Sequence, residues 1–328
     1  MHLVVIIPCF NEDPTVGRVV RAVPRNIEGI ARTDVVVVDD GSTDGTAEAA
    51  RRAGARVVSH PDNRGVGVAF NTGIDEAIRL GADVTVNMDG DGQFDPADIP
   101  VLIRPILEGK ADFVTASRFK DKSLIPSMPG VKKWGNRRMA ELISLLVGRR
   151  FHDVSCGFRA YSRETILNLN LFGRFTYTQE TFLDLAFRGT RIVETPLRIR
   201  GEREFGESRV ASSLWRYAVN SAKIVFRTFR DYKPLRFFGF VSAALFLVAL
   251  LLGGFFFIRY FMTGRFSGHL WAGFVAGFCL TQSTLFFATG LLADMFDRIR
   301  RNQEKLVYFE RRRLMECSDR VPDKDGSS

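Results

Sequence analysis

The chain has 328 residues, of which 46% are hydrophobic and 25% are charged, so most of it is expected to be globular. This length allows one large domain with an appendage, or two domains. The formal net charge of +9 predicts an anionic partner: nucleic acid, phospholipid head groups or a phosphorylated substrate.

The N-terminus and the cysteines argue against two further classes of protein. The first residues, MHLVVIIPCF, have neither the charged start nor the cleavage site of a signal peptide, and they predict a first strand instead. The cysteines are far apart and form no CxxC pair, which argues against a zinc site or a disulfide framework and suits a reducing compartment. The four cysteines are Cys9, Cys156, Cys279 and Cys317.

Short apolar runs alternate with helix-like stretches over residues 1–118. Because these runs are continuous in Val and Ile rather than alternating, they indicate strands buried on both faces, and hence a mostly parallel sheet of an α/β fold. The expected strands are 3–7, 34–39, 55–59, 84–88 and 112–116. The expected helices lie near 14–23, 44–53, 66–80 and 97–109.

Polar residues stand where the expected strands end, and ligands of such sheets bind beyond the carboxyl ends of the strands. The absence of GxGxxG after the first strand and of GxxxxGK[ST] disfavours a dinucleotide fold or a P-loop. The acids in VVVVDDGSTDGT could accept hydrogen bonds from a ribose or a base, or could serve only turn and cap chemistry, with Asp44 as the helix cap. Likewise, NRGVGVAFNTGI could be only a loop that enters a helix. The strand-end residues are Asn11, Glu12, Asp39, Asp40, Asp89 and Asp91.

Two segments, 237–258 and 270–293, contain no charged residue. At about 1.5 Å per residue, each is long enough as a helix to cross a hydrocarbon core of roughly 30 Å. A pair of buried core helices is the alternative, although core helices seldom run this long without a polar face. Basic residues that flank the two segments predict an integral membrane protein with both termini in the cytoplasm and the link 259–269 outside.

Two further segments have an amphipathic pattern. In 212–230, aromatic and aliphatic residues mix with basic ones at helical spacing, which predicts a helix in the membrane interface. In 134–147, Arg137 and Arg138 lie on one side and Leu142, Leu145 and Leu146 on the other, so this helix either lies in the interface or packs on the domain core.

Seven motifs, taken together, resemble the inverting GT-A glycosyltransferases of family 2, over about residues 1–210. Within that family the chain is similar to the dolichol- and polyprenol-phosphate sugar synthases, including members anchored by a C-terminal helix pair. The motifs are VVIIPCFNE, VVVVDDGSTDGT, NRGVGVAFNTGI, MDGDGQFDP, ASRF, DVSCGFRAYSRE and REFGESRV, in that order. The QxxRW motif of processive polysaccharide synthases does not occur, which argues against a polymerase.

The resemblance implies that Asp89 and Asp91 bind Mg²⁺ or Mn²⁺ with the donor diphosphate, with Gln93 beside them as a third metal contact. Hard cations prefer carboxylate oxygens, and alternate residues of an extended segment face the same way, so these side chains can converge on one ion. Asp95 precedes Pro96 and is expected to cap the next helix.

Further roles come from the same resemblance. Asp153 is implied to be a base or an orienting residue near the reaction centre. Arg118 is implied to hold the phosphate of a lipid acceptor, since a guanidinium suits phosphate oxygens. Glu180 is either a distal base or a residue of a helix start. The residues implied to line the nucleotide pocket are Pro8, Asn11, Glu12, Asp39 and Asp40, and those implied to face donor or acceptor phosphates are Arg203, Ser208 and Arg209.

The sequence therefore predicts a metal-dependent inverting transferase that moves a sugar from a nucleotide sugar to a polyprenyl or dolichyl phosphate at the cytoplasmic face of the membrane. A UDP-sugar is favoured over GDP-mannose by association with the DGDGQ form. The alternatives are another lipid or glycan acceptor, or an inactive membrane scaffold. A homo-oligomer is expected, and nucleic acid is not. The expected domains are a GT-A domain (1–210), a juxtamembrane helix (211–233), two transmembrane helices (234–296) and a basic tail (297–328).

Overall fold

The computed structural model describes the chain except for residues 172–176, 201–222, 224–225, 228, 266–267 and 320–328. The described chain divides into two compact units. The first contains residues 1–225 and 306–328, and the second contains residues 226–305. The expected helix at 212–230 and the expected domain boundaries at 210 and 211 fall in or beside residues outside the described ones, and they stay predictions.

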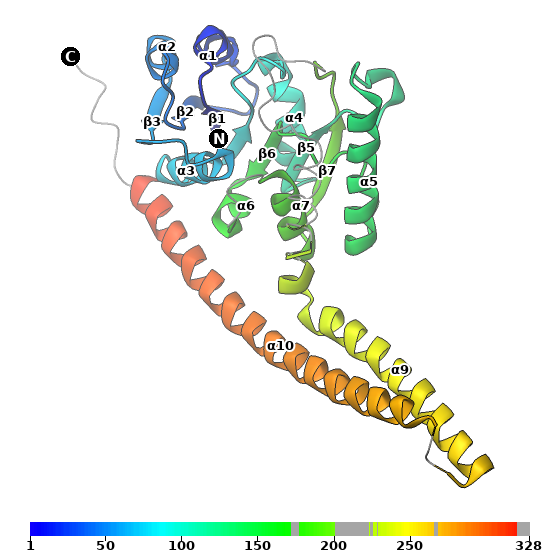
Figure 1. The fold of residues 1–328 in the computed structure, drawn as a ribbon. Coiled ribbons are helices and arrows are strands. Elements are labelled where there is room, and N and C mark those ends of the chain that lie inside the picture. Colours follow the sequence, from blue (N-terminus) through cyan, green and yellow to red (C-terminus); the bar gives the residue numbers. More distant parts are fainter. Residues whose placement is uncertain (172–176, 201–222, 224–225, 228, 266–267, 320–328) are drawn as a thin grey trace. The chain divides into compact units, whose positions relative to one another are not determined.

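A mixed seven-stranded sheet forms the centre of the first unit (Figure 1). Its strand order is β3-β2-β1-β4-β6-β5-β7. The pairs among β1 to β4 are parallel, as is β5 with β7, whereas β6 runs antiparallel to both of its neighbours. The strands are β1 (His2–Cys9), β2 (Arg32–Asp39), β3 (Arg56–Ser59), β4 (Val84–Asn87), β5 (Phe113–Ser117), β6 (Arg159–Ser162) and β7 (Ile192–Pro196).

The predicted mostly parallel α/β fold is confirmed, and each of the five predicted strands corresponds to an observed one. The sequence did not reveal β6 and β7. The helices of this unit are α1 (Asp13–Ala22), α2 (Thr46–Arg52), α3 (Val66–Arg79), α4 (Ile99–Leu107), α5 (Gly130–Val147), α6 (Arg163–Asn168) and α7 (Thr178–Phe187). Short 3₁₀ turns lie at η1 (Pro96–Asp98) and η2 (Lys122–Leu124).

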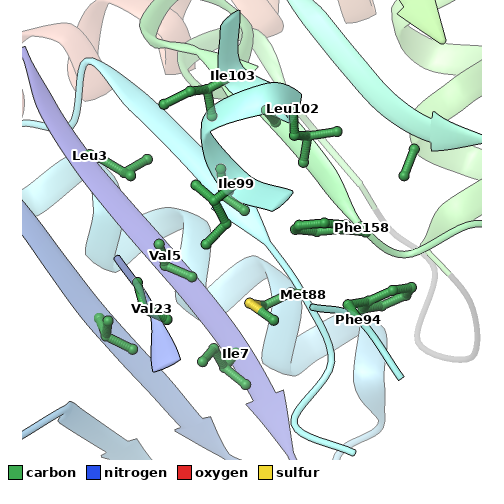
Figure 2. Close-up of a cluster of buried hydrophobic side chains, with 14 of the residues drawn as sticks. Leu3, Val5, Ile7, Val23, Met88, Phe94, Ile99, Leu102, Ile103 and Phe158 are labelled. Carbon is green, nitrogen blue, oxygen red and sulfur yellow. The ribbon is translucent and has the colours of Figure 1, made fainter. Parts of the chain in front are cut away.

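Alternate residues of β1 face two different hydrophobic clusters, because side chains alternate across a strand. Leu3, Val5 and Ile7 pack with α1, α2 and α4, whereas Val4 and Ile6 pack with α3, α5, α6 and α7. Figure 2 shows the first cluster, in which the β1 side chains lie against Ile99 and Leu102 of α4. The sheet is therefore covered on both faces, as its continuous apolar strands require.

Helix α5 packs on the second hydrophobic cluster, and Leu146 is partly buried against it. Asn136, Ala140 and Ile143 are its buried residues. Leu142 and Leu145, which were expected on the apolar side, are exposed. Among the described residues, these two leucines of α5 are therefore not part of a hydrophobic cluster.

The second unit contains the helix pair α9 (Pro234–Thr263) and the first part of α10 (Leu270–Asp319). Both helices are long and apolar enough to cross a membrane, and only 11% and 22% of their most apolar stretches are buried. Core helices would be mostly buried, so the alternative of two core helices is disfavoured. Within the unit, Ser242 and Ser283 exchange hydroxyl-to-carbonyl hydrogen bonds of 2.9 Å.

Helix α10 does not end with the second apolar segment but continues to Asp319. Its residues from Leu306 onward belong to the first unit. There the Tyr308 hydroxyl donates to Glu164 Oε2 at 3.0 Å, Arg311 donates to the carbonyl of Leu169, and the Met315 side chain is buried among the residues of the second cluster. These residues share one helix face, so the segment packs as a helix of the first unit rather than as a separate tail.

Candidate active site

Two loops that follow β1 and β2 are joined by side-chain hydrogen bonds. Asn11 has a φ of 54°, in the left-handed region that asparagine tolerates better than most residues. Its Oδ1 accepts from the Thr43 amide at 2.8 Å, and its own amide donates to Ser42 Oγ at 2.9 Å. Asp39 Oδ1 accepts from the Ser42 amide at 3.0 Å. The predicted nucleotide residues Asn11 and Asp39 thus lie together at one edge of the sheet.

Asp40 is buried and holds the loop that leads into α3. Its two carboxylate oxygens accept from the backbone amides of Arg64 (3.0 Å) and Gly65 (2.8 Å). Its Oδ1 also lies 2.7 Å from Nδ1 of His60. Asp40 therefore acts on this side of the site as a residue that fixes a loop.

The carboxylate stretch after β4 is a turn between two buried apolar anchors. The strand ends at Asn87, and Met88 and Phe94 are buried on either side of the turn (Figure 2). Phe94 stacks on Phe158 with ring centroids 5.2 Å apart. Gly92 has a φ of 74°, which a side chain would strain. The stretch is therefore not extended, and the predicted reason for convergence, alternation along a strand, does not apply.

The turn places its polar side chains differently. Asp89 and Gln93 line a cavity. Asp91 is 1% exposed, and its Oδ1 accepts from the Gln93 amide at 3.0 Å. Asp95 Oδ1 accepts from the Ala97 amide at 3.0 Å at the start of η1, which confirms the predicted cap. Asp44 Oδ1 likewise accepts from the amide of Thr46, the first residue of α2.

Space beside Asp89 is preserved by a glycine from another loop. A Cβ at Gly157 would lie 3.3 Å from Asp89 Oδ2 and 3.3 Å from the Tyr177 hydroxyl. Asn87 fixes this arrangement, because its Nδ2 donates to the Gly157 carbonyl (2.8 Å) and to the Tyr177 oxygen (2.6 Å). Burial and then the charge of Asp89 raise the pKa of Tyr177, so its hydroxyl stays neutral.

A bidentate ion pair forms the other side of the site. Arg118, which follows β5, donates to Asp153 from Nε (2.7 Å), Nη2 (2.9 Å) and its backbone amide (3.1 Å). The Ser155 amide also donates to Asp153 Oδ1, at 3.1 Å. Burial alone would raise the pKa of Asp153, but the charge and hydrogen bonds of Arg118 keep it below its usual range.

The cavity brings Asp89 of the turn together with Arg118. Burial, and next the charge of Asp153, raise the pKa of Cys156 in its wall to about 12, which leaves this thiol protonated. Further lining residues are Phe94, Pro126, Met128, Lys132, Ser155, Gly157, Ile199 and Arg200.

The remaining predicted residues divide into three groups. Pro8 lies in β1 opposite Val38, and Glu12 precedes α1. Glu180 lies in the first turn of α7, which confirms its place at a helix start. Arg203, Ser208 and Arg209 lie outside the described residues.

Several residues of the site are not among those predicted from the sequence, namely Asn87, Lys132, Gly157, Tyr177, Glu194 and Arg200. Asn87 offered a signal, since a polar residue that ends a run of buried apolar ones requires a partner. The others offered none, because their partners are distant in sequence.

An α/β sheet with acidic loops at its strand ends and a cavity of mixed charge agrees with a nucleotide-sugar transferase of the GT-A fold. Residues 4–168 match the family described as glycosyl transferase family 2. The chain belongs to this family.

Characterised relatives and a solved structure support this assignment. The chain is 32% identical over 178 residues to UDP-N-acetylglucosamine–dolichyl-phosphate N-acetylglucosaminyltransferase of Methanococcus voltae, covering 49% of this chain and 69% of that protein. It is 31% identical over 227 residues to undecaprenyl-phosphate mannosyltransferase of Micrococcus luteus, covering 65% of this chain and 89% of that protein. The structure of glucosyl-3-phosphoglycerate synthase from Mycobacterium tuberculosis with UDP has the same fold, with a TM-score of 0.56 at 22% identity over 70% of this chain and 80% of that one.

Proposed function

We propose that this protein transfers a sugar from a nucleotide sugar to the phosphate of a polyprenyl or dolichyl phosphate. One observation carries the proposal: within the described part of the chain, the cavity is lined by one carboxylate, Asp89, and three cationic side chains, Arg118, Lys132 and Arg200. Such a lining suits two phosphate-bearing ligands, a donor diphosphate that shares a cation with the carboxylate and an acceptor phosphate that meets the guanidinium.

Asp89 and Asp91 are the residues proposed to hold the divalent cation, Mg²⁺ or Mn²⁺, and Gln93 stands beside them. Their carboxylates offer the hard oxygen ligands that these ions prefer, and Gly157 keeps the space beside Asp89 open. No cluster of three or more His, Cys, Asp or Glu occurs among the described residues. This agrees with an ion that uses one or two carboxylates together with substrate phosphates. When bound, the ion would offset the charge of the departing diphosphate.

Arg118 is proposed to bind the acceptor phosphate, and Asp153 to orient Arg118 rather than to act as a base. Both oxygens of Asp153 already accept two hydrogen bonds each, and its pKa is lowered. A hydroxyl acceptor would need a base, whereas a phosphomonoester, with a second pKa of about 6, is already an anionic nucleophile near neutral pH. The site therefore favours a phosphate acceptor over a glycan or a diacylglycerol. Attack in line with the departing diphosphate would invert the anomeric centre.

An apolar strip on α5 is proposed to face the lipid. Val131 and Trp134 are each 63% exposed and Leu145 is 79% exposed on one side of the helix, and the Arg138 guanidinium lies 5.8 Å from the centre of the Trp134 ring. Lys132 of the same helix lines the cavity, so the helix that bears this strip also borders the proposed phosphate site. The helix pair would anchor the protein, with both termini in the cytoplasm, where nucleotide sugars are found.

The names of the relatives agree with this acceptor class, because two of them are named as transferases that act on dolichyl phosphate or undecaprenyl phosphate. They name different sugars, so the donor is left open, and a UDP-sugar is the first to test. A homo-oligomer remains part of the proposal.

The test is a transfer assay with purified full-length protein, a panel of radiolabelled UDP- and GDP-sugars and a short-chain polyprenyl phosphate. Diacylglycerol and the unphosphorylated polyprenol serve as control acceptors. We expect glycolipid only with the phosphate, dependent on Mg²⁺ or Mn²⁺ and abolished by EDTA. Transfer to a hydroxyl acceptor at an equal rate, or no transfer with any donor, contradicts the proposal.

A further inference from the structure

Glu194 of β7 lies behind the ion pair of the site and binds the loop that carries Asp153. Its Oε1 accepts from the backbone amides of Asp153 (2.8 Å) and His152 (2.9 Å), and its Oε2 lies 2.9 Å from Nδ1 of His152. We propose that Glu194 is a positioning residue for the acceptor phosphate, acting through Asp153 on Arg118. This inference rests on the proposed function of Arg118.

The contacts that link Glu194 to Arg118 through Asp153 are direct and largely buried. The side chain of Glu194 is 7% exposed, that of Asp153 is fully buried and that of Arg118 is 13% exposed. The backbone amide of Asp153 is fixed by Glu194, and both oxygens of its carboxylate are fixed by Arg118. Since little water can replace these partners, the position of the guanidinium depends on the carboxylate of β7.

The backbone of β7 also holds the strand from which Arg118 projects. In the parallel pair of β5 and β7, Glu194 lies opposite Thr115, and Arg118 comes directly after β5. Lys120 Nζ donates to the Glu194 carbonyl at 2.6 Å. The segment that carries Arg118 is thus bound to β7 both before and after this residue.

Arg159 holds the same loop from the opposite side. Its fully buried guanidinium donates to the carbonyls of Val154 (2.9 Å) and Cys156 (2.7 Å), and also to that of Thr178 in α7 (2.9 Å). Glu194 therefore accepts from the amides at the start of the loop, and Arg159 donates to the carbonyls that follow. With Arg159 in place, loss of Glu194 should loosen the Asp153 end of the loop while the remainder stays folded.

Because Glu194 and Arg159 hold different ends of the loop, loss of Glu194 should cause a specific kinetic change. Without the Glu194 carboxylate, Asp153 can shift and Arg118 with it, so the acceptor phosphate binds less well. The Glu194 carboxylate bonds to His152 and Asp153 on the Arg118 side of the cavity, so donor binding at Asp89 and Asp91 should stay unchanged. A residue that served only stability would instead lower the fraction of active protein and leave both KM values as they were.

The experiment compares Glu194→Ala, Glu194→Gln and wild type in the full chain, with the nucleotide sugar that wild type uses and a short-chain polyprenyl phosphate. For Glu194→Ala we expect the acceptor KM to rise by about tenfold or more, with donor KM within about twofold, because small displacements of a binding group are costly. Glu194→Gln keeps an oxygen for the two amides and should restore the acceptor KM to within about threefold of wild type.

Two further variants separate this role from general destabilisation. Glu76→Ala removes another buried carboxylate, which lies on α3 and pairs with Arg56 and Arg79. This variant should leave the acceptor KM unchanged. Adding Glu194→Ala to Arg118→Ala should have no further effect on acceptor KM, because Glu194 acts through Arg118.

The outcomes distinguish the inference from the proposed function. If wild type transfers sugar to the phosphate acceptor but Glu194→Ala leaves the acceptor KM unchanged, or raises it equally in the Arg118→Ala background, the positioning role is wrong and the proposed function stands. If wild type transfers nothing to the phosphate acceptor, the proposed function fails, and the positioning role fails with it.

Discussion

The two halves of the central sheet contribute opposite charges to the site. In the parallel half, β3-β2-β1-β4, the strand ends carry Asp39, Asp40 and Asp89, and Asp39 and Asp40 accept hydrogen bonds from backbone amides of nearby loops. In the mixed half, β6-β5-β7, the strand end carries Arg118 against a buried carboxylate.

Under the proposed function, this difference would separate the two phosphate-bearing ligands, the donor and the acceptor. An acidic edge can bind a diphosphate only with a cation between them, whereas a basic edge can bind a phosphate directly. We therefore expect variants of the parallel half to alter donor and metal dependence, and variants of the mixed half to alter acceptor dependence.

The largest expected effect is that of Asp89→Ala in the parallel half. Loss of this cavity carboxylate should lower kcat/KM on the order of 10³-fold, equal to about 4 kcal/mol of transition-state stabilisation. The transfer assay measures it across a Mn²⁺ titration. The control is Asp95→Ala, which removes a cap of the same stretch and should cost only about 1 kcal/mol of stability. Full activity of Asp89→Ala would show that this carboxylate is not a metal ligand.

Arg118→Ala should give the next largest effect, on the mixed half. We expect an acceptor KM about 100-fold higher and an unchanged donor KM, because a charge-assisted phosphate contact is lost. Removal of this partner also leaves Asp153 buried without its ion pair, which should lower the free energy of unfolding by about 3–5 kcal/mol. Arg118→Lys keeps the charge and should recover part of the acceptor binding and part of the free energy of unfolding. An increase in donor KM instead would break the division between the halves.

The pH dependence should follow the acceptor rather than Asp153. Because the folded-state pKa of Asp153 is lowered, its stabilising contribution is complete above its unfolded pKa of about 3.9 and is lost only as pH falls through the folded value. Acceptor kcat/KM should therefore fall about tenfold per unit below about pH 6, the second pKa of a phosphomonoester. A phosphonate acceptor has a higher second pKa, so with this acceptor the decrease in kcat/KM should begin at a higher pH. If the decrease in kcat/KM occurs at the same pH with both acceptors, the titrating group belongs to the protein.

The smallest expected effect is that of Asp40→Asn. One carboxylate oxygen that accepts from Arg64, Gly65 or His60 is replaced by an amide, so the loop before α3 should loosen and the donor KM should rise about threefold. Acceptor KM should not change. Asp121→Asn, which alters a similar local turn at η2, is the control and should leave both KM values at wild type.

The parallel half was predictable because its strands are apolar on both faces. Runs such as VVVV in β2 can only be buried in a sheet of this kind, and acids at their ends then fall at one edge. The cap at Asp95 was also predictable, since it depends on residues adjacent in sequence. The turn geometry of Asp89 to Gln93 was not, because it depends on the buried anchors Met88 and Phe94.

Two strands of the mixed half, β6 and β7, could not be predicted because polar side chains interrupt them, whereas β5 corresponds to the predicted strand 112–116. Arg159 begins β6 and Glu194 is the centre of β7, and both are buried, so neither strand has an apolar run. Their charges are tolerated only because loops distant in sequence supply partners, Val154 and Cys156 carbonyls for one and the His152 and Asp153 amides for the other. A single sequence gives no indication of such pairings.

The end of α10 has a consequence for the order in which the protein can fold. Met315 completes the second hydrophobic cluster of the first unit, and Arg311 and Tyr308 bind Leu169 and Glu164 beside it. These residues are synthesised after both apolar helices, so the ribosome must release the whole helix pair before the core of the catalytic unit can close. A chain interrupted after residue 305 would therefore contain both apolar helices but lack the part of the first unit that Tyr308, Arg311 and Met315 supply.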